Sequence, residues 1–548
     1  MEITTFSAIS TFGDARAPTS FMRAAAPSKS WDYYAAALFV VGPMRALVAI
    51  SPIMLCVLAL NQLGFLGAVI VDSARVVPWM LYFASETLFL IYYFRTKHRL
   101  GQPHAAPPQI VSDLAARRHA PTSVVAFFED MMRHTPSVRA FVEEWFFDRP
   151  MEQLTRADMR PWVAYLYYSK EWRDTSAAER HDIDHIVTRL FTLAKVHEPT
   201  SAAPLHRPLH PCIRHTLDDF DTTARPWMIY AITIGMNTIA GGILRFAGFR
   251  RHTLTAGLHY WHRPARASPA AEPLVFCHGI GAGLMLYFPL LWLLLSTHSN
   301  RAMLLLDMPY ASMQLSDEIP SKATMLACLQ RMLDAHAIRQ AHWMGHSLGT
   351  AVVSWVCHEM PHAVAHATFI DPIVFYLWKR DVAYNFLYRP PSSGLELLLW
   401  YFASTEVHIV NIMRRHFWWF NMVCFPEHLP RDPTTGALAA TVFLSSHDLI
   451  VNATHVYAHL LRAGALLQAD ADEDDDGLDD ERHVVETIWW DGFTHGEMLL
   501  HGHALSSVTS NVKTRGPAAA AAHKPKWHWT DYLAHRFQVA DDIARREL

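Results

Sequence analysis

Short apolar runs rich in β-forming residues alternate with helical stretches from about residue 253 to about residue 515. This alternation is typical of βαβ units, in which parallel strands form one central sheet with helices on its faces. Ligands bind such sheets at the carboxyl ends of the strands, so the residues that follow each strand are candidates for a site. The predicted strands are residues 274–277, 302–306, 342–344, 367–370, 440–444 and 484–490.

The pentapeptide Gly345-His346-Ser347-Leu348-Gly349 contains the strongest candidate nucleophile, Ser347. A G-x-S-x-G match alone is weak evidence in a long chain, but this one follows the predicted strand 342–344 and precedes a helical stretch. A strand–turn–helix elbow uses the two glycines for its strained turn, and it exposes the serine hydroxyl above the sheet. The backbone N–H of Leu348 then lies at a helix N-terminus, where it can face an oxyanion.

A serine hydroxyl needs a general base, and two later strand ends supply candidates for the base and its acid. Asp448 follows the strand 440–444, and His495-Gly496 follows the strand 484–490. The chain order of serine, acid and histidine is the order expected for this elbow. We therefore expect His495 to take the proton of Ser347, and Asp448 to orient the imidazole and stabilise its charged form.

Asp371 is the alternative acid, because it also ends a predicted strand after the serine. Asp-Pro at a strand end is more often a turn former, so the sequence favours Asp448. A second oxyanion donor is expected in the loop His278-Gly279-Ile280-Gly281. There the N–H of Ile280 is the candidate, and His278 is interpreted as a structural loop residue.

Together these features resemble the α/β-hydrolase superfamily over roughly residues 250–515. The resemblance rests on the His-Gly-Ile-Gly loop, the strand end Leu306-Asp307-Met308-Pro309, the serine elbow, Asp448 and His495-Gly496. It implies an α/β fold with a mostly parallel central sheet flanked by helices, a helical cap over the site, and a structural role for Asp307. Epoxide hydrolase and dehalogenase chemistry are disfavoured, since those relatives carry Asp where Ser347 stands.

Neither a metal nor a cofactor is expected. The 6 cysteines lie far apart without a CxxC pair, and the 34 histidines do not cluster with them. The acidic insertion 470–481 lacks the glycine-punctuated pattern of a calcium loop and is interpreted as a solvated loop. The formal net charge of −4 gives no reason to expect a nucleic-acid partner.

The N-terminal region indicates membrane contact. Only 18% of residues are charged, against roughly 25% in soluble domains. Residues 46–71 hold no charged side chain and are long enough to cross a bilayer, and residues 76–94 are interrupted only by Glu86. The alternatives are a buried hairpin of the two helices, or a second segment that lies in the interface and changes the topology. The basic cluster at 95–99 favours the cytoplasmic side for the hydrolase domain. A third apolar run, 227–244, is either a membrane-touching helix or a buried one.

These features divide the chain into successive units. They are a disordered segment 1–34, membrane-anchoring helices 35–99, a helical domain 100–210, an apolar helix and linker 211–252, hydrolase core 253–371, a helical cap 372–435, hydrolase core 436–515 with the acidic loop 470–481, and a tail 516–548.

The predicted cap is rich in aromatic residues, most of which are expected to pack it against the core. An apolar cap on a membrane-held enzyme favours a lipid-like, long-chain acyl ester over a small polar ester. The predicted activity is therefore that of a lipase or esterase working through an acyl-enzyme. An acyltransferase or a thioesterase could use the same three residues, and a non-catalytic lipid-binding scaffold is the alternative of another class. Oligomeric state and organelle are left open.

Overall fold

The computed structural model describes residues 28–63, 65, 73–102, 123–199, 210–265, 272–433, 435–471 and 485–513. Residues 1–27 of the predicted disordered segment 1–34, residues 472–481 of the acidic insertion and the predicted tail 516–548 lie outside the described residues. The prediction of disorder is wrong at the end of its range, because a helix begins at Trp31.

One eight-stranded sheet, in the order β1-β2-β4-β3-β5-β6-β7-β8, forms the centre of the described structure. The six predicted strands correspond to its parallel part, which runs from β4 at one side to β8 at the other. The bounds of these strands are Leu274–Cys277 (β3), Met303–Asp307 (β4), Ala341–His346 (β5), Val364–Ile370 (β6), Ala440–Ser445 (β7) and Glu486–Trp490 (β8).

Two antiparallel strands, β1 (Arg250–Thr253) and β2 (His259–Arg263), extend the sheet beyond β4. Neither strand is predicted from the sequence, and the predicted start of the core at residue 253 falls at the last residue of β1. The reason is composition. Strand β1 is an edge strand whose residues are largely exposed, so it carries no apolar run that would mark it.

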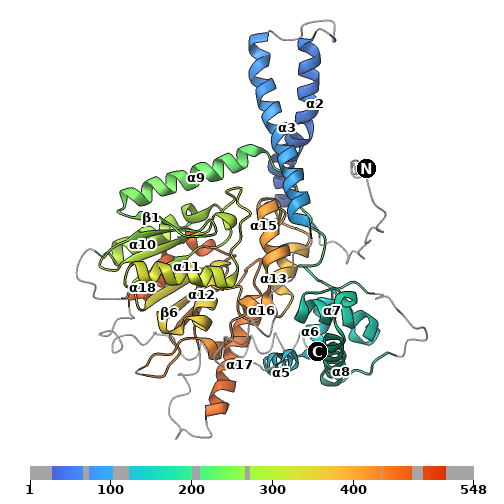
Figure 1. Ribbon diagram of the computed structural model, residues 1–548, viewed down its shortest axis with the longest axis vertical. Helices are drawn as coiled ribbons and strands as arrows, with labels where there is room; N and C mark the ends of the chain where they lie inside the picture. The colour runs from blue at the N-terminus through green and yellow to red at the C-terminus, as the bar shows by residue number, and fades with distance from the viewer. Residues whose placement is uncertain are drawn as a thin grey trace.

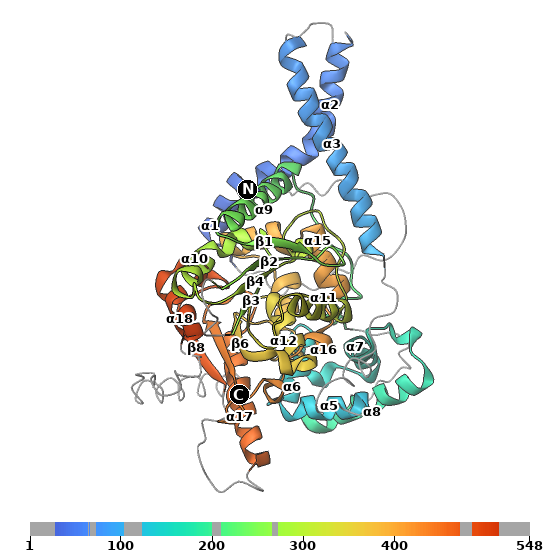
Figure 2. The same ribbon diagram turned by 60° about the vertical axis from the view of Figure 1, so that its left-hand side comes forward.

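Helices cover both faces of the sheet (Figure 2). One face packs on α10 (Phe288–Thr297) and α18 (Gly502–Lys513), and the other packs on α11 (Lys322–Ala335) and α12 (Gly349–Glu359). Alternate side chains of a strand point to opposite faces, which divides the core in two. In β3, Leu274 and Phe276 join the cluster under α10, while Val275 and Cys277 join the cluster under α12.

The cap insertion consists of short helices and not of long ones. They include α13 (Asp381–Ala383), α14 (Gly394–Leu399), α15 (Val407–Asn411) and α16 (Trp419–Met422), with π-helical turns between several of them. After the cap, α17 (Ala453–Ala471) follows β7.

The helical unit before the sheet packs against this cap (Figure 1). It comprises α5 (Val124–Arg133), α6 (Val138–Trp145), α7 (Arg156–Tyr168) and α8 (Ala177–Ala194). The indole N–H of Trp145 donates to the carbonyl of Trp378 at 3.2 Å, and Trp419 donates to the carbonyl of Leu166 at 2.8 Å. Many cap aromatics therefore join the cap to this helical unit.

Within the part of the chain that the structure describes, three helices are long and apolar enough to cross a membrane by length and composition: Trp31–Gln62, Val76–Gly101 and Trp227–Phe246. The first comprises α1 (Trp31–Ala36), a π-helical turn and α2 (Gly42–Gln62). The second belongs to α3 (Ser73–Gly101), which runs beside α2 as a hairpin that projects from the body (Figure 1).

The third helix, α9 (Trp227–Phe246), differs because it lies across the body beside β1 (Figures 1 and 2). Thr233 donates to the carbonyl of Met313 at 2.8 Å, and Gly241 lies against the ring of Trp261. Its outward face is apolar, with Ile232, Ile239 and Phe246 at 54%, 57% and 96% exposure. The inward face is thus packed against the body, and contact of the outward face with a membrane stays a prediction.

Candidate active site

Ser347 lies on a sharp turn between β5 and α12. Its φ of +52° is in the left-handed region, which a non-glycine residue adopts only where the surrounding structure requires it. The flanking glycines permit the turn, because a Cβ on Gly345 would lie 2.7 Å from the carbonyl oxygen of Gly349, and one on Gly349 would lie 2.2 Å from the carbonyl oxygen of Cys277. No larger residue fits at either position without moving backbone.

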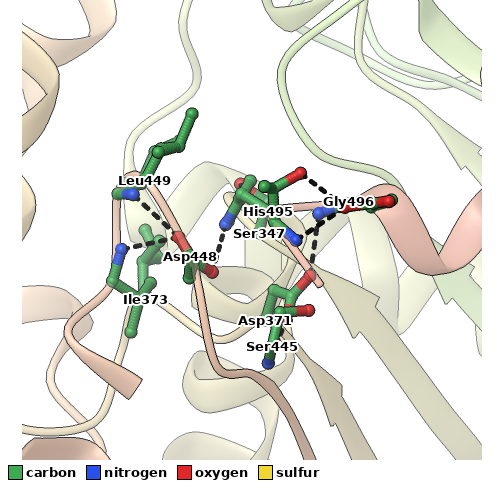
Figure 3. A network of polar contacts seen from close by, with 12 residues as sticks. Ser347, Asp371, Ile373, Ser445, Asp448, Leu449, His495 and Gly496 are labelled. Carbon is green, nitrogen blue, oxygen red and sulfur yellow. Dashed lines mark hydrogen bonds and ion pairs between the residues drawn. The ribbon is translucent and has the colours of Figure 1, made fainter. Parts of the chain in front are cut away.

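The structure brings Ser347, His495 and Asp448 into one chain of contacts (Figure 3). The Oγ of Ser347 lies 2.8 Å from Nε2 of His495, and Nδ1 of His495 lies 2.6 Å from Oδ2 of Asp448. The three side chains come from the carboxyl ends of β5, β8 and β7. This arrangement orients Nδ1–H of the imidazole toward the carboxylate and leaves Nε2 to accept the serine proton.

The second carboxylate oxygen of Asp448 also accepts hydrogen bonds, which hold the side chain in place. Oδ1 accepts hydrogen bonds from the backbone N–H groups of Ile450 at 2.7 Å and Val451 at 2.8 Å. Its side chain is almost completely buried. The carboxylate is thus held in one orientation toward His495 by two amides of the loop that follows β7.

The protonated form of His495 is stabilised despite its burial. Removal from water disfavours the imidazolium, but the adjacent Asp448 and Asp371 carboxylates outweigh this effect and raise the pKa of His495. A buried imidazole whose charged form is supported in this way can accept a proton from a neighbouring hydroxyl.

Asp371 lies beside the same three residues but makes different contacts (Figure 3). Its Oδ1 accepts from the N–H of Ser445 at 3.0 Å, and its Oδ2 accepts from the N–H of Gly496 at 2.8 Å. Burial and the Asp448 carboxylate raise the pKa of Asp371 to about 6. Asp371 therefore links the end of β7 to the loop that carries His495, while the imidazole nitrogen bonds to Asp448.

The loop His278–Gly283 touches the elbow directly. A Cβ on Gly279 would lie 2.8 Å from Cβ of Ser347. The N–H of Gly279 donates to the Tyr287 hydroxyl at 2.8 Å, and the N–H of Gly281 donates to the carbonyl of Ala311 at 3.0 Å. The N–H of Ile280, between them, has no acceptor among the described residues, and neither does that of Leu348. Both amides are thus free for a ligand beside Ser347.

Two histidines support this loop and the elbow. The nitrogens of His278 bond to backbone on both sides, Nδ1 to the carbonyl of Gly279 at 2.7 Å and Nε2 to the N–H of Met308 at 3.0 Å. Nδ1 of His346 lies 2.8 Å from the Tyr287 hydroxyl. Because that hydroxyl already accepts from Gly279, its proton points to His346. The supporting role of Tyr287 is not predicted from the sequence, because Tyr287 lies in an apolar stretch without a motif.

Among the described residues, two groups of side chains have ligand atoms close enough together to hold a metal ion. One is Asp371, Asp448 and His495, whose polar atoms are already engaged in the hydrogen bonds described above. The other is His252, His262 and His336. The rings of His262 and His336 stack with centroids 3.7 Å apart. Asp307, interpreted as structural, is buried 3.7 Å from Arg251.

A cavity of about 680 Å³ begins at Leu348, beside the elbow. It lies between α11, α12 and the cap, and its lining is mostly apolar. Cavities of this size accommodate ligands of the size of a drug or a lipid chain. We refer to it as the α12 cavity.

Residues 272–479 match the family model of the alpha/beta hydrolase fold. No curated protein matches the chain. Similar solved structures include a membrane phospholipase A described as a novel bacterial virulence factor, with 11% identity, a TM-score of 0.33, and coverage of 53% of this chain and 94% of that one.

Two further similar structures are the naproxen esterase of Bacillus subtilis (16% identity, TM-score 0.34, 51% of this chain and 96% of that one) and a putative lipase of Acinetobacter baumannii (14%, 0.34, 51% and 94%). Similarity at this level assigns no activity to this chain. The family match and the parallel sheet with its serine elbow show the α/β-hydrolase fold in the matched part of the chain, residues 272–479.

Proposed function

We propose that this chain is a membrane-attached serine hydrolase that cleaves hydrophobic acyl esters. The observation that carries the proposal is the continuous contact from Ser347 Oγ to His495 Nε2 at 2.8 Å and from His495 Nδ1 to Asp448 at 2.6 Å. Ser347 is the proposed nucleophile, His495 the general base and acid, and Asp448 the residue that orients and stabilises the imidazolium.

The proposed reaction has two halves. Ser347 Oγ attacks the ester carbonyl carbon while its proton passes to Nε2 of His495, and the oxyanion accepts hydrogen bonds from the N–H groups of Ile280 and Leu348. The tetrahedral intermediate then breaks its bond to the alcohol oxygen, which takes the proton from His495. Water attacks the acyl-enzyme by the same route, and the acid product leaves with Ser347 restored.

Attachment to a membrane rests on the hairpin of α2 and α3. Large apolar side chains along it are exposed, among them Trp79 at 60%, Ile53 at 62%, and Leu81 and Leu88 at 66%. Water disfavours such a surface, whereas the hydrocarbon core of a bilayer accommodates it. The outward apolar face of α9 would then lie along the bilayer surface on the hydrolase side. A substrate drawn from that bilayer is hydrophobic, which is the reason for proposing a long-chain acyl ester.

Hydrolysis is tested with the full chain in membranes and a fluorogenic acyl ester. The wild type is expected to release the alcohol, and Ser347→Ala is expected to reduce turnover to the level of control membranes. Ser296→Ala, a change of the same kind at an exposed position on α10, serves as the matched control and should retain wild-type turnover. Full turnover by Ser347→Ala would refute the proposed nucleophile.

Attachment is tested separately by extraction of these membranes at alkaline pH. An integral protein remains in the pellet, whereas release of the full chain into the supernatant would show that the hairpin does not insert. Protease added to sealed vesicles then reports the side of the hydrolase domain, which the basic residues 95–99 predict to be cytoplasmic.

A further inference from the structure

One face of α12 lines the α12 cavity from the elbow to the end of the helix. The residues concerned are Leu348, Ala351, Val352, Trp355 and Glu359, at the three- and four-residue spacing that places side chains on one side of a helix. At a rise of about 1.5 Å per residue, the line from Leu348 to Glu359 is about 16 Å long. The cavity is therefore elongated, and it runs away from Ser347.

The other walls are also largely apolar. Helix α11 contributes Ala323 and Leu326, the cap contributes Ile412, Trp418 and Met422, and Tyr310 and Ile319 complete the lining near the sheet. The charged groups gather at the end far from the elbow, where Lys322 Nζ and Glu359 Oε1 form an ion pair at 2.9 Å. A ligand that follows α12 from Ser347 would meet apolar surface first and this ion pair last.

We propose that the α12 cavity binds the acyl chain of the substrate, with the chain extended along α12 from Ser347 toward Glu359. This inference rests on the proposed function, and it deepens it by assigning the site that reads chain length. Leu348 connects the two regions, because it follows Ser347, its backbone N–H is the proposed oxyanion donor, and it lines the cavity. Each methylene buried along the cavity should raise kcat/KM roughly fourfold.

The binding mode also predicts where selectivity changes. Ala351 lies three residues after Leu348, about 4.5 Å along the helix axis, so enlarging it would block the chain near its carbonyl end. Ala323 is exposed at the start of α11 beside the ion pair, so enlarging it would obstruct only the far end. Ala335, exposed at the other end of α11 and outside the cavity, is the matched control for a bulky substitution.

The test measures kcat/KM for acetyl, butyryl, octanoyl, dodecanoyl and palmitoyl esters of one alcohol with the full chain in membranes. For the wild type, kcat/KM should rise with chain length. Ala351→Phe should lower the ratio of octanoyl to acetyl kcat/KM at least tenfold, and Ala323→Trp should lower only the ratio for the longest chains. Ala335→Trp should keep the wild-type profile.

Two results would overturn the inference. One is an unchanged chain-length profile in both Ala323→Trp and Ala351→Phe while the short esters are still hydrolysed, which leaves the proposed function intact. The other is a profile that Ala335→Trp changes as much as Ala323→Trp does. Absence of any Ser347-dependent hydrolysis of the acetyl ester by the wild type would instead contradict the proposed function itself.

Discussion

The carboxyl ends of β6 and β7 each carry a buried aspartate, and the two side chains lie beside the same histidine. At the end of β7, Asp448 turns one oxygen to the imidazole of His495 and the other to two loop amides. At the end of β6, both oxygens of Asp371 accept hydrogen bonds from backbone amides, those of Ser445 and Gly496. The two aspartates hold equivalent positions at strand ends, but their hydrogen-bond partners differ. We therefore expect them to have different roles.

The largest expected effect separates the two acids by activity. Asp448→Asn keeps the shape of the side chain but removes the charge that orients and stabilises the imidazolium, so kcat should fall by about 10⁴-fold. Asp371→Asn leaves the Asp448–His495 contact in place and should lower kcat by only about tenfold. Steady-state kinetics of both variants on one ester measure the contrast. Full turnover in Asp448→Asn together with its loss in Asp371→Asn would reverse the assignment.

The next effect concerns stability. Asn at position 371 can accept from one of the two amides, but its NH₂ group then faces the other amide, leaving a buried N–H unpaired at a cost of about 1–3 kcal/mol. Thermal unfolding should show this loss in Asp371→Asn. Asp491→Asn, at an exposed aspartate just after β8, is the control and should change stability by no more than about 0.5 kcal/mol. Equal melting temperatures for the two variants would contradict the bracing role of Asp371.

A smaller effect is expected in the pH dependence of activity. The reaction needs neutral His495, whose pKa is raised, so kcat/KM should fall as the pH drops through a value above the ordinary imidazole pKa of about 6.5. The Asp371 carboxylate contributes to that raised pKa. In Asp371→Asn the acidic limb of the profile should therefore move to lower pH. An unmoved limb would show that the two groups do not interact.

The smallest expected effect is the pH dependence of stability contributed by Asp371. Its pKa is raised from 3.8 to about 6 on folding, so between these values the folded state binds more protons than the unfolded state, and stability falls as the pH rises. The stability deficit of Asp371→Asn relative to wild type should therefore be greatest below pH 4 and shrink toward pH 6. Denaturant unfolding across this range measures it, and a deficit independent of pH would argue against the raised pKa.

The sequence was sufficient to predict the parallel sheet, because buried strands of an α/β core appear as continuous apolar runs. The two antiparallel strands, β1 at the edge and β2 beside it, carry no such run and were missed. The sequence also predicts that Ser347, Asp448 and His495 follow the carboxyl ends of three strands. The choice between Asp448 and Asp371 depends on which oxygen faces which nitrogen, and this is set by loop conformations that a strand pattern does not encode.

The apolar helices show the same limit. The helices Val76–Gly101 and Trp227–Phe246 are both long and apolar enough to cross a membrane. One extends into the projecting hairpin, while the other lies along the sheet edge with Gly241 against Trp261. Tertiary contacts, and not composition, separate them. Composition also does not predict the partners of the cap, because Trp378 and Trp419 hydrogen-bond to the helical unit α5–α8.

The central claim is that Ser347 is a nucleophile activated by His495 and Asp448. It is tested most directly by treating membranes that contain the full chain with a fluorophosphonate probe and locating the adduct by peptide mass spectrometry. We predict one adduct on Ser347 in the wild type, slow labelling in Asp448→Asn, and none in Ser347→Ala or His495→Ala. Folded wild type that takes up no probe, or a Ser347→Ala variant that is labelled as strongly as the wild type, would contradict the account.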